Sequence, residues 1–99
     1  EPELAPTLHT ALRDGPGAEV AVGGIAANAL GARRIGRIAH DLAQAQGVTA
    51  LLVPDAAIAA SQRLLWDRLR QWVEPAGACA LAALTSGAYA PAPGERVAV

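Results

Sequence analysis

The 99-residue sequence predicts an α/β fold, a partial doubly wound sheet with flanking helices, formed by one small domain over residues 1–99. Three observations favour this class. Val48–Pro54 is a continuous apolar run between a glycine and a proline, as is typical of a buried strand. Asp55–Trp72 repeats apolar residues at helical spacing, and Arg96–Val99 is typical of a second strand. Helices and strands therefore alternate along the chain.

The first half of the chain is predicted to contain two more helices. Leu4–Arg13 places three leucines on one stripe, at positions 4, 8 and 12. Glu19–Val22 alternates and is short, so an extended conformation is expected there. Ala32–Gln46 is the better helix, and its apolar stripe consists of Ile35, Ile38 and Leu42.

The second half holds the clearest helical signals. Asp55 is expected to act as N-cap of the helix that follows it. Pro75 suits the first position of another helix. Residues Ala76–Leu84 are apolar all round, which predicts burial on every side. Cys79 lies within this segment and is expected to pack as a small hydrophobic residue.

Composition excludes several classes of partner. The net charge is −1, so no basic surface indicates nucleic acid or an anionic membrane, and no apolar run approaches a membrane span. One cysteine excludes an internal disulfide and suits a reducing, cytoplasmic location. All eight basic residues are arginine, and methionine is absent. The chain begins at Glu1 and stops at Val99 without clear terminal elements, so we expect it to be a piece of a longer protein.

Glu74 is the candidate functional residue. It is followed by a proline, small residues and an apolar run, so it lies at the start of a helix. Helix N-termini favour anions, which explains a carboxylate there without any ligand. The alternative is an acid held at a pocket with its charge toward a ligand. Other candidates are weaker: the arginines at 33, 34 and 37 suit a solvated face, the glycines match no phosphate-binding motif, and the two histidines lack metal-ligand spacing.

Four consecutive stretches resemble the C-terminal third of the threonine/serine dehydratases. They are "EPELAPTLHTAL", "VGGIAANALGARRIG", "DAAIAASQRLLWDRLRQWVEPAGACALAAL" and "SGAYAPAPGERVAV". These dehydratases are pyridoxal-phosphate enzymes with the tryptophan synthase β-like fold. The segment E-P-x-G-A followed by A-L-A-A-L is the most specific part of the resemblance.

The resemblance implies a set of site residues. Glu74 corresponds to the family's acid near the cofactor ring. The segment "IAANAL" resembles a site-lining I-A-D-G-L, with Asn28 in place of aspartate and Ala29 in place of glycine, so Ala29 is a cofactor-contacting candidate. In cation-dependent members, oxygen ligands suited to Mg²⁺, Ca²⁺ or K⁺ would correspond to Glu1 and Ala5, whereas Thr7 replaces the third ligand, an acid.

The activity implied by the resemblance is the conversion of L-threonine or L-serine to a 2-oxo acid and ammonia, with pyridoxal phosphate as cofactor. The family's cofactor-bonding lysine has no counterpart here, so no catalytic residue is assigned and the isolated chain is expected to be inactive. The resemblance also implies an amino-acid substrate and a homo-oligomeric parent. Two alternatives stay open: another reaction on the same cofactor, such as racemisation or a synthase reaction, and a small non-catalytic interaction module.

Overall fold

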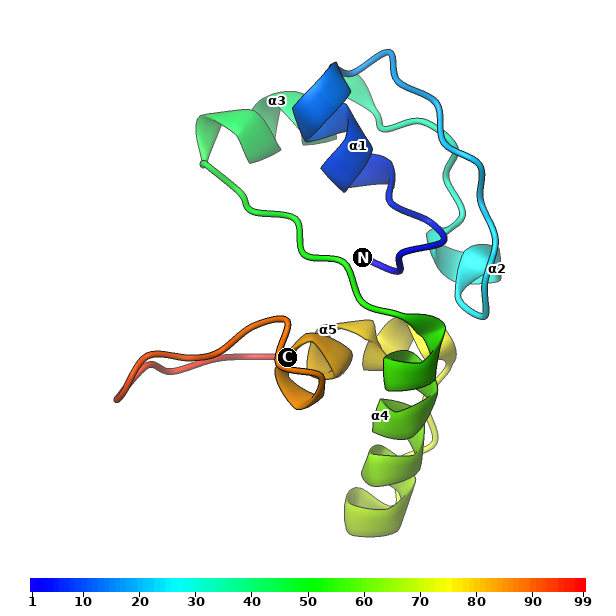
Figure 1. Cartoon of the computed structure of the whole chain (residues 1–99), viewed down its shortest axis with the longest axis vertical. Coiled ribbons are helices and arrows are strands. Elements are labelled where there is room, and N and C mark those ends of the chain that lie inside the picture. The colour runs from blue at the N-terminus through cyan, green and yellow to red at the C-terminus, as the bar shows by residue number, and fades with distance from the viewer.

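The computed structural model describes all 99 residues and contains five helices joined by extended segments. They are α1 (Thr7–Asp14), α2 (Ala27–Leu30), α3 (Arg37–Ala45), α4 (Asp55–Leu69) and α5 (Pro75–Thr85). Figure 1 shows α1 and α3 together at one end of the molecule and α4 with α5 at the other. The extended segment before α4 runs between the two groups, and the residues after α5 leave the helices as an arm.

The predicted doubly wound sheet is wrong, because the fold is all helical. Val48–Pro54 is extended as expected, but it forms only one isolated parallel bridge, between Val53 and Pro2. The Val53 N–H donates to the Glu1 carbonyl at 2.9 Å, and the Glu3 N–H donates to Val53 at 2.9 Å. The Glu1 amino group also donates to the Leu51 carbonyl at 2.7 Å, but the pairing stops there because the chain turns at residues 3–4 and α4 begins at Asp55.

The other expected extended segments also lack sheet partners. Glu19–Val22 has one backbone hydrogen bond to a distant segment, from the Val20 N–H to the Arg33 carbonyl at 2.9 Å. Arg96–Val99 has none, and its residues are exposed. A strand requires a neighbour along its whole length. The apolar, β-branched composition of these segments therefore yields extended chain without a sheet.

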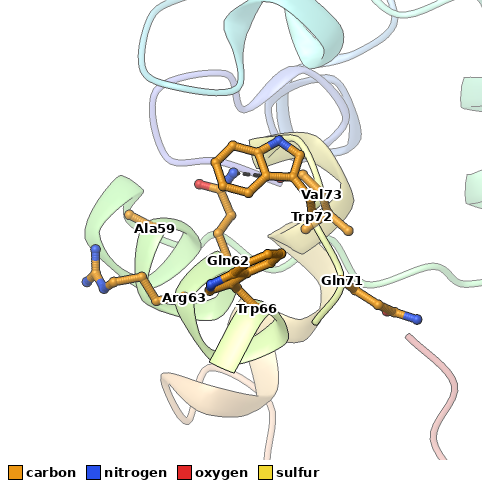
Figure 2. A pocket seen from close by; sticks show the side chains of 7 residues that line it. All are labelled: Ala59, Gln62, Arg63, Trp66, Gln71, Trp72 and Val73. Carbon is orange, nitrogen blue, oxygen red and sulfur yellow. Dashed lines mark hydrogen bonds between the residues drawn. The ribbon is translucent and has the colours of Figure 1, made fainter. Parts of the chain in front are cut away.

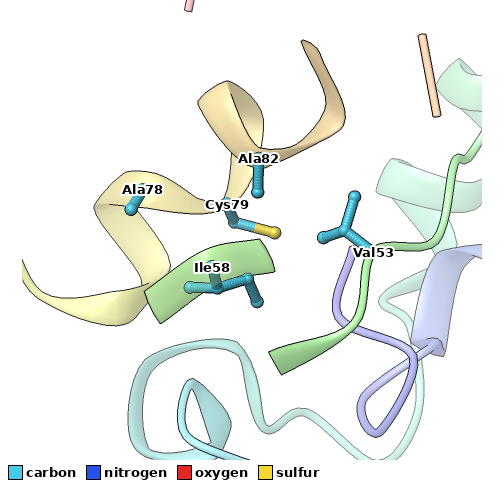
Figure 3. Close-up of a cluster of buried hydrophobic side chains, with 5 residues drawn as sticks. All are labelled: Val53, Ile58, Ala78, Cys79 and Ala82. Atoms are coloured by element: carbon cyan, nitrogen blue, oxygen red, sulfur yellow. The ribbon is translucent and has the colours of Figure 1, made fainter. Parts of the chain in front are cut away.

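The main core lies between α4 and α5. Figure 3 shows its five buried side chains converging from α4, α5 and the segment that precedes α4: Val53, Ile58, Ala78, Cys79 and Ala82. The three residues from α5 are small, so the helices approach closely but bury little apolar volume. Cys79 is buried without a disulfide, which confirms the prediction for it.

Burial of α5 on every side is not observed. Ala78 and Ala82 face α4, whereas Gly77 and Ala80 are exposed. Only 14 of the 99 residues are buried. The apolar character of α5 comes from alanine, which tolerates exposure better than larger apolar residues because it exposes little apolar surface.

In the second helix pair, α1 and α3, the buried face of α3 is not the one predicted. In α3 the expected stripe points outward, with Ile38 76% and Leu42 59% exposed. His40 and Ala43 are the buried residues of this helix, and Thr7 and Ala11 are those of α1, against which α3 packs. The face of α3 with His40 and Ala43 therefore meets α1, and the predicted stripe faces solvent. The helix is also shorter than the predicted Ala32–Gln46, because residues before Gly36 are not helical.

The boundaries of α4 and α5 follow local backbone chemistry. Pro75 is the first residue of α5, as predicted. Asp55 is not an N-cap, because Pro54 occupies that position and Asp55 is the first helical residue. The helix ends at Leu69, three residues earlier than predicted, because Arg70 adopts the left-handed conformation with φ 54°. Trp72 is therefore outside the helix and is 86% exposed.

Candidate functional site

Glu74 lies at the N-cap position of α5 with its carboxylate free. Its backbone is extended, with φ −69° and ψ 163°, and its carbonyl accepts a hydrogen bond from the Gly77 N–H at 3.0 Å. The side chain makes no capping hydrogen bond, and the residue is exposed. The carboxylate is thus an unpartnered anion beside the positive end of a helix dipole.

The turn before Glu74 is fixed to α4 by polar contacts. The Gln62 side-chain amide donates to the Val73 carbonyl at 2.8 Å. At the other end of α5, the hydroxyls of Ser61 and Thr85 are 2.9 Å apart, and Ser61 is buried. These bonds, together with the core between the helices, hold the start of α5 in one position.

A hollow with two tryptophan rings adjoins this turn. Figure 2 shows Trp66 from α4 and Trp72 from the turn, together with Gln62, whose bond to Val73 is dashed. The ring centroids are 6.0 Å apart at an interplanar angle of 84°, and the Arg70 guanidinium lies 5.6 Å from the Trp66 centroid. The hollow has a volume of 240 Å³ and does not include Glu74 in its lining. The hollow therefore lies beside the candidate site, because Val73 in its lining directly precedes Glu74.

The other three predicted site residues meet at a different place. A cavity of 310 Å³ has Glu1, Ala5 and Ala29 in its lining. Ala29 belongs to α2 and is exposed, whereas Ala5 is buried beneath the amino-terminal turn. The structure therefore joins the predicted cation ligands to one predicted cofactor contact, but Glu74 does not line this cavity.

The Glu1 carboxylate already has partners within the chain. Its two oxygens accept hydrogen bonds from the Leu8 N–H at 2.8 Å and the His9 N–H at 2.7 Å, in the first turn of α1. The Thr7 hydroxyl donates to the Ala32 carbonyl. No group of three or more His, Cys, Asp or Glu side chains is placed to hold a metal. The predicted cation site at Glu1 and Ala5 has no support, and Glu1 serves as a helix cap.

Replacing Glu1 by alanine is expected to destabilise the fold by about 1–2 kcal/mol, because two N–H groups of α1 lose their acceptors. Urea unfolding followed by circular dichroism measures this change. Glu3→Ala is the matched control, since that side chain is exposed and makes no hydrogen bond. If magnesium chloride raised the unfolding midpoint of the wild type but not of Glu1→Ala, a cation role would replace the capping role.

One contact near the predicted site was missed by the sequence reasoning. The Asp55 carboxylate accepts a hydrogen bond from the Ile25 N–H at 3.0 Å, just before α2. The acid was identified only as a helix-start residue, and 30 positions separate it from its partner. No local pattern reports a contact over that separation.

The remaining titratable residues form no further centre. His40 is buried, and its ring Nδ1 lies 3.3 Å from the Asp41 carboxylate. Of the three clustered arginines, Arg34 pairs with Glu19 and all are exposed. Shifted pKa values occur in exposed pairs far from Glu74 in sequence: the hydrogen bond from the Tyr89 hydroxyl lowers the pKa of Glu95, and that bond raises the pKa of Tyr89.

Comparison with known protein families identifies the chain. The profile of the PALP family, described as pyridoxal-phosphate dependent enzyme, matches residues 1–99. The chain belongs to the pyridoxal-phosphate-dependent enzyme family. Comparison with curated proteins and with solved structures gave no match.

Membership of this pyridoxal-phosphate-dependent family implies pyridoxal phosphate as the cofactor of the parent enzyme. Glu74 offers an exposed carboxylate without a partner, and it lines neither the hollow between the tryptophans nor the cavity at Ala29. The covalent bond to the cofactor requires a lysine amine, and these 99 residues contain no lysine. None of the five helices has both the length and the apolarity required to cross a membrane. The cytoplasmic location and the homo-oligomer stay predictions.

Proposed function

We propose that these residues form a non-covalent part of the active site of a threonine/serine dehydratase. The family match over the whole chain supports a pyridoxal-phosphate enzyme. The dehydratase assignment depends on the resemblance of four stretches, above all the E-P-x-G-A segment at the start of α5. The single observation that supports a site there is the carboxylate of Glu74, which lacks any partner in the chain.

In this proposal each named residue has a limited task. Pyridoxal phosphate, when bound, withdraws electrons from the α-carbon of an amino acid. Glu74 supplies a fixed negative charge near the ring, and the small residues behind it leave space for a flat group. Ala29, exposed on α2, contributes a surface against which the cofactor lies. The group that removes the α-proton is not among these residues, because the chain has no lysine.

The overall reaction removes the α-proton and the β-hydroxyl of L-threonine or L-serine, and hydrolysis then releases ammonia and a 2-oxo acid. Racemases and synthases use the same cofactor on similar amino acids. Contacts to the substrate side chain distinguish these reactions, and no such contact is assigned within this chain. The dehydratase is preferred because the quoted segments resemble that group.

The proposal is tested by comparing two proteins. The complete gene product that contains these residues, loaded with pyridoxal phosphate, is expected to release 2-oxo acid from L-threonine or L-serine in a coupled lactate dehydrogenase assay. The isolated 99-residue chain is expected to release none, because it lacks the lysine. Racemisation without 2-oxo acid formation by the complete protein would reject the dehydratase assignment. Failure of that protein to bind the cofactor would favour the non-catalytic interaction module.

A further inference from the structure

Asp55 holds the segment that leads into α2. Its Oδ2 atom accepts the Ile25 N–H at 3.0 Å, and a second bond, from the Gly23 N–H to the Leu4 carbonyl at 2.8 Å, holds the same loop. The loop is therefore held between the amino-terminal turn and the first residue of α4. Two polar contacts therefore set its position without a sheet.

Gly24 allows the carboxylate to come this close. Its φ of 79° lies in the left-handed region, which favours glycine. A Cβ atom at Gly24 would lie 2.8 Å from both carboxylate oxygens of Asp55, closer than real Cβ contacts. Gly24 therefore leaves the space that the Asp55 carboxylate occupies when it accepts the Ile25 N–H.

The second carboxylate oxygen of Asp55 occupies an energetically unfavourable position. Asp55 Oδ1 is buried and has no hydrogen-bond partner. Leaving a polar atom in this state opposes folding, and such atoms in folded proteins call for an explanation. A role in helix capping does not supply one, because Pro54 occupies the N-cap and Asp55 bonds across to another segment.

The contact joins the two parts of the candidate site. The loop continues directly into α2, which contains Ala29. Asp55 begins α4, and α4 packs along α5, whose N-cap is Glu74. Gln62 on α4 in turn fixes the residue before Glu74. A single carboxylate therefore connects the α2 segment to the helix pair that places Glu74.

We propose that Asp55 is a positioning residue that sets the α2 segment, with Ala29, relative to the α4–α5 pair and hence to Glu74. The inference rests on the proposed function, in which Ala29 and Glu74 contact the same cofactor. Asp55 itself is assigned no contact with the cofactor. Gly24 is also required for this contact, because only a residue without a side chain leaves room for the carboxylate.

The experiment compares three variants of the complete, cofactor-loaded protein: Asp55→Ala, Asp55→Asn and Asp67→Ala. Hydrogen exchange measured by mass spectrometry on peptides covering residues 23–30 is expected to be about 10-fold faster in Asp55→Ala, because the Ile25 N–H loses a charged acceptor. Asp55→Asn keeps an oxygen for this N–H and is expected to restore slow exchange. Asp67→Ala is the matched control, since Asp67 is exposed on the same helix.

A second readout addresses the cofactor. The dissociation constant of pyridoxal phosphate, measured by fluorescence titration, is expected to rise about 10-fold in Asp55→Ala and to return toward the wild-type value in Asp55→Asn. Gly24→Ala is expected to act like Asp55→Ala. Its effect is expected to be smaller when Asp55 is already alanine, since the clash with the carboxylate is then absent.

The outcomes separate the two proposals. Unchanged exchange in residues 23–30 of Asp55→Ala rejects the positioning role. An equal acceleration in peptides from residues 75–85 also rejects it, because the effect would then be general destabilisation. A wild-type protein that binds no pyridoxal phosphate rejects the proposed function, while the exchange measurement still decides whether Asp55 holds the loop.

Discussion

Replacing Ile58 by alanine is expected to destabilise the fold by about 2–5 kcal/mol. Ile58 is completely buried and is the largest side chain of the core between α4 and α5. Its neighbours Ala78 and Ala82 are small and lie on a helix, so they cannot move in to fill the space. Small domains are stable by only about 5–15 kcal/mol, so this loss is a large share of the total.

Urea unfolding followed by far-ultraviolet circular dichroism measures the effect, and Ile38→Ala is the matched control. Ile38 is 76% exposed on α3, so its truncation is expected to change the unfolding free energy by less than about 0.5 kcal/mol. The same chemical change at a buried and an exposed isoleucine isolates the contribution of burial. Equal effects at the two positions would show that the core between α4 and α5 is placed wrongly.

The helices could be predicted because their signals are local. Proline at position 75 marks the start of α5, and the apolar repeat after Asp55 marks α4. Each signal acts within a turn or two of the chain and needs no knowledge of distant residues. The early end of α4 is an exception, because an arginine adopts the left-handed conformation at position 70 where a glycine is usual.

The sheet could not be predicted reliably because pairing is not local. Val48–Pro54 has the composition of a buried strand, but only Val53 gains a bridge. The prediction of which face of α3 is buried was wrong for a related reason. Periodicity shows that Ile38 and Leu42 share a side, but which side is buried depends on α1, which packs against the opposite face of α3.

The candidate site shows the same division. Glu74 could be placed at the start of a helix from the proline that follows it. The exposure of its side chain and the absence of a hydrogen-bond partner could not be predicted, because both depend on how α4 and the preceding turn pack. The contact between Asp55 and Ile25 spans 30 residues, and the two N–H partners that make the Glu1 carboxylate a helix cap are seven and eight positions away, so no local pattern reports either contact.

Changing Glu74 to glutamine is expected to weaken pyridoxal-phosphate binding and to lower kcat/KM of the complete enzyme by roughly 10- to 100-fold. Glutamine keeps the shape of the side chain but removes its charge, and hydrogen bonds that involve a charged group contribute about 1.5–3 kcal/mol. Folding should hardly respond, because the side chain is exposed and unbonded. Loss of a charge near a helix N-terminus costs less than about 1 kcal/mol.

The comparison of binding with stability distinguishes the two interpretations of this acid. Fluorescence titration gives the cofactor affinity and urea unfolding gives the stability, each measured for Glu74→Gln and for the control Glu3→Gln, which neutralises another exposed carboxylate. If Glu74 contacts the cofactor, affinity falls while stability is retained, and Glu3→Gln changes neither. If the carboxylate only complements the helix dipole, stability falls slightly and affinity is unchanged. That second result would reject Glu74 as a cofactor contact. The proposed site would then lose its main supporting observation, the unpartnered carboxylate at the start of α5.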